Sequence, residues 1–433
     1  MMGSLSERGS EIAQKGSILY EGLQMCLQDP YDKDHNIQGY LNLGTSENKI
    51  CFDLLHERLM RPDMHILEPY LLNYNDPRGI YRFRQEVASF LTDYCHGSEP
   101  LNPDNVIIMN GCNAIFSALS AVICNPGDGF LLPAPYYTGI DTYTSLYSGV
   151  KPVHVPLYSK VAEGESYPFE LTIPKLEDAM ENGKKQGIRI TALIVINPQN
   201  PLGFIYSDKL LKEFLEFGQR HSLHLVFDEI YMSSVLDAVP FTSILSFHNV
   251  PDPEMIHFIW GLSKDFAMNG MRVGVLYSKN QHVIKSMSQL ACLHQCPGPT
   301  QYMLSQFLKD RDWLDKVFFP VNKRRLKKSQ KILISGLKKL GIPVLRSSVG
   351  LYMWADFRKF LKSQTFEAEM DLWLQLIANK VYIAPGKSFE CYEPGWFRVT
   401  SSLPSDSLQT CIQRLQNILK VTPGHNYGIP YKG

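Results

Sequence analysis

The stretch Trp260-Gly-Leu-Ser-Lys-Asp-Phe-Ala-Met-Asn-Gly-Met-Arg-Val-Gly274 follows one apolar run, residues 255–260, and leads into another, residues 273–277. Both runs have the length and composition of buried strands, so the stretch places Lys264 in a loop at the edge of a sheet. An amine held in a dry pocket loses its proton more readily and can attack a carbonyl. Lys264 is therefore a candidate covalent anchor, although most lysines are solvated surface groups.

The overall composition is that of an ordinary globular protein. The chain has 433 residues, which exceeds what one simple core usually holds, so more than one domain is expected. The formal net charge is +0, and no bulk field draws the protein to nucleic acid or to an anionic membrane. No signal-peptide core is found near residue 1, and no apolar run is long enough to span a bilayer. We expect a cytoplasmic protein that binds neither nucleic acid nor membrane.

The nine cysteines are scattered along the chain, and their number is odd. Only Cys292 and Cys296 lie close together, with His294 between them. Zinc ligation there is one interpretation, but no second Cys/His pair has matching spacing. Reduced, buried thiols in a cytosolic enzyme are the simpler interpretation, and no metal site is predicted.

Strand-like runs and helical patterns alternate through the first three hundred residues. The runs are residues 105–109, 130–132, 153–155, 190–196, 223–227, 255–260 and 273–277. Helical patterns lie between several of them, for example over residues 207–219. This alternation predicts an α/β domain with a mostly parallel sheet, and ligands gather at the carboxyl ends of the strands of such sheets.

The two ends of the chain have a different texture. Helices are predicted over residues 301–319, 322–340 and 366–379, and strands over 350–356 and 396–399, which indicates a smaller α+β domain. The basic helix 322–340 is consistent with a nucleic-acid patch, but a solvated amphipathic face is favoured because the chain is neutral. The tail 422–433, rich in Gly and Pro, is expected to be loosely ordered. A helix is also predicted near the N-terminus, although Gly16 and Gly22 oppose it; its apolar residues are Ile12, Ile18, Leu19, Leu23 and Leu27.

Four polar loops follow predicted strands of the sheet, and they carry complementary chemistry. They are Gly111-Cys112-Asn113, Asn197-Pro-Gln-Asn-Pro-Leu-Gly203, Asp228-Glu-Ile-Tyr231 and Ser263-Lys264. The first opens a helix, whose free N–H groups suit a phosphate. Together the loops place five groups at one edge of the sheet: a carboxylate, a phenol, an amide, a lysine and an anion-binding turn. This set suits a covalently bound ligand that has an aromatic cationic ring and a phosphate group.

Each residue then has an assignable role. Lys264 would form an imine with an aldehyde, and Asp228 would pair with a protonated ring nitrogen. Further roles are hydrogen bonds to a ring phenolate from Asn200 and Tyr231, phosphate contacts from Arg272 and Ser263, and ring stacking by Tyr137. Each also has a plainer alternative: a strand-end cap for Asp228, a core aromatic for Tyr231 and a turn residue for Asn200. Their joint occurrence in this order favours the cofactor.

With these motifs the chain resembles the fold-type I pyridoxal-phosphate enzymes, the aspartate-aminotransferase superfamily. Within it, the chain is similar to the 1-aminocyclopropane-1-carboxylate (ACC) synthases, and most similar to their animal ACC synthase-like relatives. Besides the loops already given, the matching motifs are Leu43-Gly-Thr-Ser-Glu-Asn48, Cys51-Phe-Asp-Leu-Leu55, Pro133-Ala-Pro-Tyr-Tyr137 and Glu393-Pro-Gly-Trp-Phe-Arg398. They spread over roughly residues 5 to 420.

The resemblance implies the rest of the architecture and the substrate class. It implies an N-terminal arm with a small-domain segment (1–53), a large cofactor-binding domain (54–300), a C-terminal small domain (301–433) and a homodimer. It also implies that Arg398 binds the α-carboxylate of an amino-acid substrate and that Glu47 lies near the substrate. Three functions stay open: ACC synthase-like lyase or transaminase chemistry, a class I/II aminotransferase, and an inactive fold with a binding role.

Two positions depart from the plant ACC synthases. Plant enzymes carry a Tyr at the position of Pro77 and a Ser at the position of Gly261. A hydrogen bond to a charged group contributes about 1.5–3 kcal/mol, so losing both would weaken cofactor binding by roughly two to four powers of ten. Arg78 and Tyr74 are the neighbours that would compensate.

Overall fold

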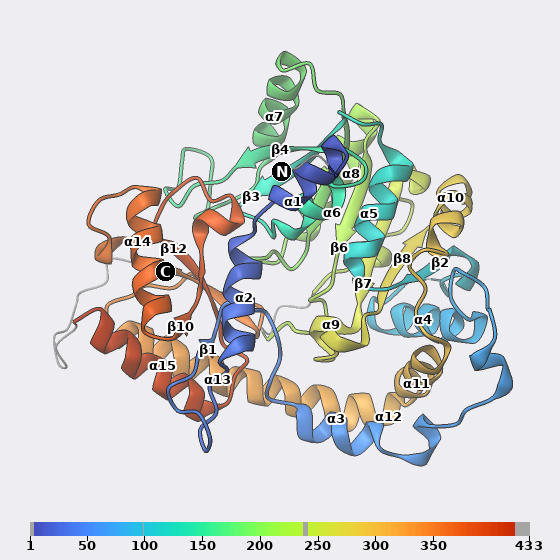
Figure 1. The fold of residues 1–433 in the computed structure, drawn as a ribbon. Coiled ribbons are helices and arrows are strands. Elements are labelled where there is room, and N and C mark those ends of the chain that lie inside the picture. The colour runs from blue at the N-terminus through green and yellow to red at the C-terminus, as the bar shows by residue number, and fades with distance from the viewer. Residues whose placement is uncertain (1–3, 98, 237–240, 421–433) are drawn as a thin grey trace.

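The computed structural model describes residues 4–97, 99–236 and 241–420 (Figure 1). Its largest part is a seven-stranded sheet with the order β2-β8-β7-β6-β5-β3-β4. The strands are β2 (Val106–Met109), β3 (Gly129–Ala134), β4 (Lys151–Pro156), β5 (Ile190–Ile196), β6 (His224–Asp228), β7 (Ile256–Gly261) and β8 (Gly274–Ser278). Among these strands only β8 runs antiparallel to its neighbours, so the predicted mostly parallel sheet is confirmed.

Helices cover both faces of this sheet because successive strand residues point to opposite sides. Ile194 and Ile196 of β5 pack into one apolar cluster, whereas Leu193 and Val195 pack into another. The first cluster contains residues of α5 (Cys112–Ile123), α6 (Gly139–Ser145) and α10 (Gln281–Ala291). The second contains residues of α4 (Tyr81–Tyr94), α7 (Ile173–Lys185), α8 (Asp208–His221) and α11 (Gly298–Lys309).

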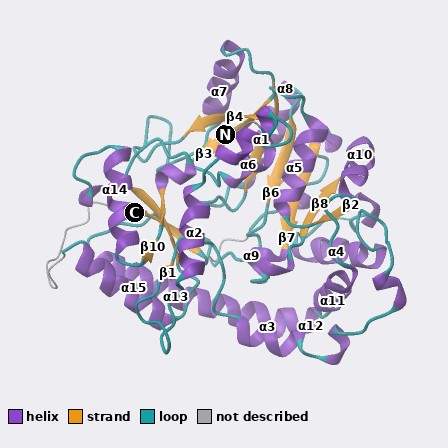
Figure 2. Cartoon of the chain, in the orientation of Figure 1, coloured by secondary structure: helices purple, strands orange, loops and turns teal. Residues whose placement is uncertain are grey.

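A second, smaller unit of structure joins the two ends of the chain. Strand β1 (Leu41–Asn42) pairs with β10 (Val381–Tyr382), and β11 (Ala384–Pro385), β12 (Trp396–Thr400) and β9 (Tyr352–Asp356) form a three-stranded sheet. Their core is completed by residues of α2 (Ile18–Gln28), α13 (Phe319–Lys339), α14 (Phe366–Ala378) and α15 (Ser405–Ile418). Figure 2 shows α2 beside these strands, far along the sequence from β10.

The N-terminal helix is broken where the glycine signal opposed it. In place of one helix there are α1 (Glu7–Gln14) and α2, separated by Lys15, Gly16 and Ser17. The Ser17 side chain accepts a hydrogen bond from Tyr20 N at 3.4 Å and caps the second helix. Further along the chain, α3 (Phe52–Leu59) begins after Cys51. Glu47 and Asn48 therefore lie before the helix and do not start it.

The prediction of one continuous helix over residues 301–319 is also wrong. It consists of α11, α12 (Arg311–Trp313) and a π-helical turn over Leu314–Phe318. Asp310 ends the first piece because its carboxylate accepts from Trp313 N at 3.2 Å and pairs with Arg58 at 2.7 Å. Because the Asp310 side chain caps the following turn and pairs with Arg58, a new helix starts at this residue and α11 does not continue through it.

The basic helix is amphipathic. Helix α13 buries Leu326, Leu333 and Leu337, and its Arg325 pairs with Asp53 at 2.5 Å. The tail 422–433 lies outside the described residues. The domain bounds at residues 53 and 300 stay a prediction; near the second bound, α11 packs against α4 of the large part.

Candidate active site

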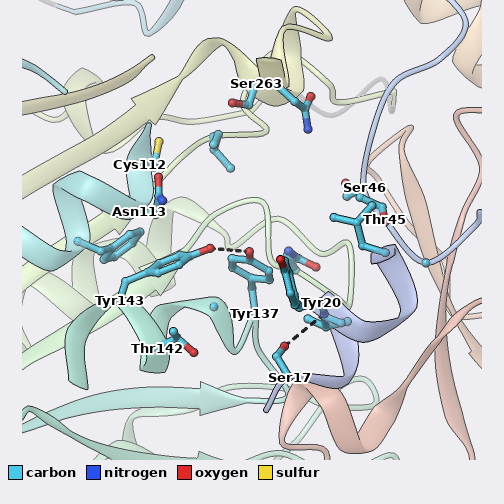
Figure 3. Close-up of a pocket in the computed structure, with 18 of the residues that line it drawn as sticks. Ser17, Tyr20, Thr45, Ser46, Cys112, Asn113, Tyr137, Thr142, Tyr143 and Ser263 are labelled. Atoms are coloured by element: carbon cyan, nitrogen blue, oxygen red, sulfur yellow. Dashed lines mark hydrogen bonds between the residues drawn. The ribbon is translucent and has the colours of Figure 1, made fainter. Parts of the chain in front are cut away.

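A cavity of about 590 Å³ lies at the edge of the large sheet, between it and the smaller unit (Figure 3). Ten of the residues singled out from the sequence line it: Cys112, Asn113, Tyr137, Asn200, Asp228, Tyr231, Ser263, Lys264, Arg272 and Arg398. Its size is within the range of about 300–1,000 Å³ that small-molecule sites occupy.

Strand direction explains why these residues meet. Strands β2, β5, β6 and β7 run the same way, so the loops after them leave the sheet at one edge. Strand β8 runs the opposite way, and its beginning therefore lies at that edge. Arg272 comes just before β8, and this reversal brings it beside the loop after β2.

Lys264 lies on α9 (Leu262–Asp265), directly after β7. Its Nζ donates to the carbonyl oxygen of Ser46 at 2.7 Å. Burial lowers the pKa of Lys264 to about 8, and the charge of Arg398 acts in the same direction. A fraction of this amine is therefore neutral near pH 7, as a nucleophile or proton acceptor requires.

Asp265 holds this lysine in place, a role that the sequence did not reveal. Its carboxylate accepts from Trp260 Nε1 at 3.1 Å, from Ser234 Oγ at 2.7 Å and from Ser233 N at 3.1 Å. These three bonds tie the short helix to the end of β7 and to the loop after β6. The only sequence signal was an acidic residue directly after Lys264 in the loop between two apolar runs.

Asp228 ends β6 and faces the cavity with 7% of its surface exposed. Its Oδ1 accepts from Ile230 N at 3.2 Å. Burial raises the pKa of Asp228 to about 7, against the opposing effects of that hydrogen bond and of the Lys264 charge. A carboxylate desolvated in this way gains most from a cation that enters the cavity.

Arg398 of β12 is the cation on the opposite wall, and it is 3% exposed. Its Nη1 donates to Asn200 Oδ1 at 2.9 Å and its Nη2 donates to Gly44 O at 2.7 Å. Its Nε is buried and has no hydrogen-bond partner among the described residues. A buried guanidinium with an unused donor is suited to a carboxylate ligand.

An anion cradle lies at the start of α5. Gly111 precedes the helix with φ +90 and provides no side-chain cap, so the first N–H groups stay available. Arg272 lies against this helix start: its Nη2 donates to Asn113 Oδ1 at 2.9 Å and its Nη1 donates to Asn269 O at 3.0 Å. Backbone N–H groups beside a guanidinium suit a phosphate.

Gly111 itself does not line the cavity, but its missing side chain makes room for the cradle. A Cβ there would collide with the Arg272 guanidinium and lie 2.6 Å from Asn113 Oδ1. Gly111→Ala is expected to lower the affinity of the cradle for a phosphate-bearing ligand at least about tenfold, because the added Cβ displaces the Arg272 cation and a hydrogen bond to a charged group contributes about 1.5–3 kcal/mol. The positive φ also adds about 1–3 kcal/mol of backbone strain, which lowers the stability of the fold.

Gly127 is a matched control for this variant, since it has φ +89 and nothing within 4 Å of its would-be Cβ. Gly127→Ala carries the same strain without the collision. Thermal unfolding should show both variants destabilised, whereas a cofactor titration should show only Gly111→Ala weakened. Equal cofactor affinity in the two variants would contradict the cradle.

The position of Gly261 has a steric explanation. Gly261 of β7 pairs with Gly274 of β8, and a Cβ at Gly261 would lie 2.7 Å from Val273 O and 3.0 Å from Cys112 Sγ. The two strands are too close here for a side chain. The serine that plant enzymes carry at this position therefore does not fit this backbone.

Aromatic residues complete the site. Tyr137 follows β3, and its hydroxyl lies 2.9 Å from that of Tyr143 (Figure 3). The Tyr231 hydroxyl lies 3.2 Å from Ser46 Oγ. Burial raises the pKa of Tyr231, so its phenol stays protonated and can donate.

Three other residues that the sequence singled out lie outside the cavity lining. Glu47 pairs with Lys49 at 3.6 Å, although its charge acts on Lys264 by raising that pKa. Arg78 is held by Asp76 at 2.8 Å, and Tyr74 is fully exposed. Their predicted roles at the site stay predictions.

Comparison with known proteins decides the family. The model of the family "Aminotransferase class I and II" matches residues 40–415. The 1-aminocyclopropane-1-carboxylate synthase-like protein 1 of Bos taurus is 45% identical over 427 residues, covering 98% of this chain and 85% of the relative. The chain belongs to the ACC synthase-like class I and II aminotransferases.

Two further proteins are similar to this ACC synthase-like chain, one in sequence and one in fold. A human protein named "probable inactive 1-aminocyclopropane-1-carboxylate synthase-like protein 2" is 42% identical, covering 96% of this chain and 73% of that one. The solved aspartate aminotransferase of Thermus thermophilus with maleate has a TM-score of 0.75 at 20% identity, covering 96% and 99%. At that identity the second likeness shows the fold alone, and it confirms the predicted fold-type I architecture.

Among the described residues, no group of three or more His, Cys, Asp or Glu side chains is placed to hold a metal ion. In the same part of the chain, no helix combines the length and the apolar character needed to cross a membrane.

Proposed function

We propose that this chain is a pyridoxal-phosphate-dependent enzyme that acts on an α-amino acid by lyase or transaminase chemistry. The observation that carries the proposal is the pairing of Lys264 and Asp228 in one cavity, with the pKa of the amine lowered to about 8 by burial. A reactive amine and a buried carboxylate in the same cavity are the two groups that a pyridine aldehyde needs.

The residues present fit this cofactor on structural grounds. The cradle at Gly111 is open because no Cβ fills it, and Arg272 provides a positive charge there. Asp228 has no full counter-charge at its buried carboxylate, which a protonated ring nitrogen would supply. When bound, the ring supplies an electron sink that stabilises negative charge on the substrate α-carbon.

The chain's own groups then have defined tasks. Lys264 Nζ would hold the cofactor covalently and, as a free amine, would accept the α-proton of the substrate. Arg398 binds the substrate carboxylate. Because Arg398 uses Asn200 Oδ1, the amide nitrogen of Asn200 stays available as a donor and, with the Tyr231 hydroxyl, would bind the ring oxygen. Tyr137 would stack on the ring, and the phosphate would be bound by Ser263, Arg272 and the residues Gly111, Cys112 and Asn113.

Assembly and location are part of the same proposal. We propose a homodimer working in the cytoplasm. The nine cysteines are all free thiols, which supports a reducing compartment. An exposed apolar surface over residues 52–81 supports association; its large members are Phe52, Met60, Ile66, Leu67, Leu72, Tyr74 and Tyr81.

The carboxylate-binding role of Arg398 makes a separate prediction. Arg398→Lys keeps the charge but loses the planar fork, so amino-acid affinity should fall about 10- to 100-fold, the value of one hydrogen bond between charged groups. Cofactor affinity should fall by clearly less, because Arg398 acts on the cofactor only through its hydrogen bond to Asn200. A titration of the cofactor-loaded protein with L-alanine, followed by the absorbance of the cofactor, measures both quantities. Parallel loss of cofactor would contradict the assignment.

The proposal is tested by loading the protein with excess pyridoxal phosphate. A visible absorbance band of the lysine-bound cofactor is expected, and its absence would sink every catalytic function in favour of a binding role. Product assays then separate the two chemistries: methylthioadenosine released from S-adenosylmethionine marks ring closure, and a keto acid marks transamination.

A further inference from the structure

The N-terminal segment, residues 12–23, forms one side of the cavity, a role that nothing in its sequence announced. It supplies eight of the lining residues: Ile12, Lys15, Gly16, Ser17, Leu19, Tyr20, Glu21 and Leu23. We call this segment the N-terminal wall. Tyr20 is 61% exposed and lies beside the cavity with Tyr137 and Tyr143 (Figure 3).

Direct contacts connect this wall to the carboxylate-binding arginine. Arg398 Nη2 donates to Gly44 O, and the ring of Tyr382 packs against Gly44 on one side and Gly22 on the other, with no room for a Cβ at either glycine. The Tyr382 hydroxyl then donates to Leu19 O at 3.1 Å. One aromatic ring therefore separates Arg398 from the wall, and a substrate held by Arg398 lies next to it.

The lining of the wall is mainly apolar and aromatic. Ile12, Leu19, Tyr20 and Leu23 belong to it, and Phe116, Tyr143 and Leu146 line the cavity from α5 and α6. Such surfaces favour apolar or aromatic groups over charged ones, because a charged group would lose its hydration without gaining a partner.

The charges on the wall disfavour an acidic substrate side chain. Glu21 lines the cavity and would repel a second carboxylate. Lys15 already has partners on α6. Its Nζ donates to Ser145 Oγ at 2.5 Å, and its charge lowers the pKa of Asp141, against the larger effect of burial. The remaining cations that line the cavity, Lys264, Arg272 and Arg398, belong to the cofactor and α-carboxylate positions.

We propose that the N-terminal wall selects α-amino acids with a bulky, uncharged side chain, and that Tyr20 contacts that side chain. The inference rests on the proposed function, because it takes the α-carboxylate to lie at Arg398. Within that function it favours transaminase chemistry, because the sulfonium side chain of S-adenosylmethionine is charged. It assigns to Tyr20 a part in specificity and none in cofactor binding.

The test uses the full-length protein loaded with pyridoxal phosphate. It is titrated with L-phenylalanine, L-alanine, L-aspartate and L-lysine, and binding is followed by the cofactor absorbance. Hydrogen exchange over residues 18–23 gives a second readout that does not depend on turnover. The variants are Tyr20→Ala and, as a matched control outside the cavity, Tyr147→Ala, whose side chain is 72% exposed.

The wild type should bind L-phenylalanine at least about tenfold more tightly than L-aspartate or L-lysine, with slower exchange over residues 18–23. Tyr20→Ala should weaken phenylalanine binding about tenfold and leave alanine and cofactor binding within about twofold. Tyr147→Ala should match the wild type.

Three results would overturn the inference while the proposed function stands: aspartate or lysine binding as tightly as phenylalanine, equal losses for alanine and phenylalanine in Tyr20→Ala, or no loss at all. If no cofactor band forms, the proposed function fails and the inference fails with it. If the band forms and responds to alanine, any failure belongs to the wall alone.

Discussion

Lys264→Met is expected to abolish covalent retention of pyridoxal phosphate and, at pH 7, to make the cofactor-free protein more stable. The first effect follows from loss of the amine, and activity should fall by at least about 10²–10⁴-fold, the usual contribution of a positioned proton acceptor. The second follows from burial, which lowers the pKa of Lys264 from 10.5 to about 8. At about 1.36 kcal/mol per pKa unit, the charged amine costs up to about 3 kcal/mol, less where cavity water screens it.

The pH dependence fixes the sign of this effect. Below pH 8 the amine is charged in both the folded and the unfolded state, so the full cost is present. As the pH rises from 8 to 10.5, the folded state is neutral while the unfolded state still binds a proton, and the cost disappears. The stability advantage of Lys264→Met should therefore be greatest at pH 7 and vanish near pH 10.5.

Urea unfolding of the cofactor-free proteins at several pH values measures the stability difference, and borohydride reduction followed by mass spectrometry locates the covalent adduct. Lys279→Met replaces an exposed lysine just after β8 and should change neither quantity. An adduct that persists in Lys264→Met would refute the anchor. A variant less stable than the wild type at pH 7 would refute the buried charge.

Asp228→Asn is expected to weaken pyridoxal phosphate affinity by roughly two to four powers of ten, because breaking a buried charge pair costs about 3–5 kcal/mol. The fold should survive, since the asparagine oxygen can still accept from Ile230 N. Equilibrium dialysis of the cofactor measures the affinity. Asp312→Asn, at an exposed ion pair on α12, is the control and should bind normally.

The affinity should also depend on pH through Asp228. Burial raises the pKa of this carboxyl from 3.8 to about 7, so below pH 7 the cofactor-free site holds a neutral acid that cannot pair with the ring. Wild-type affinity should therefore rise between pH 6 and 8. Lys264 titrates nearby and adds its own increase, so the difference between wild type and Asp228→Asn isolates the aspartate. Identical pH profiles for the two proteins would contradict the pairing.

The sequence predicted the large sheet well because its strands are short, continuous apolar runs. An amphipathic helix would be apolar on one face only, so its sequence would alternate between apolar and polar residues. It also predicted that the loops at residues 111–113, 228–231 and 263–264 converge, since parallel strands end at one edge. The reversal of β8 could not be predicted. Arg272 was assigned to the phosphate by its chemistry, and only the strand order shows how it comes to lie beside Asn113.

What the sequence missed depends on distant contacts. The N-terminal wall reads as a weak, glycine-broken helix, and its place at the cavity depends on Tyr382, about 360 residues along the chain. The break near residue 310 depends on Arg58. The glycine at 261 looked like a loss of a ligand, whereas the pairing with Gly274 shows that the backbone excludes a side chain there.

The antiparallel direction of β8 limits which insertions and deletions the chain can accept. The connection between β7 and β8 is closed at its base by the pair Gly261 and Gly274, and within it lie both Lys264 and Arg272. One closed loop therefore sets the separation between Lys264, the proposed covalent anchor, and Arg272, the proposed phosphate ligand. A single inserted or deleted residue in this loop would change both at once, so its length tolerates less variation than the sequence of its individual positions.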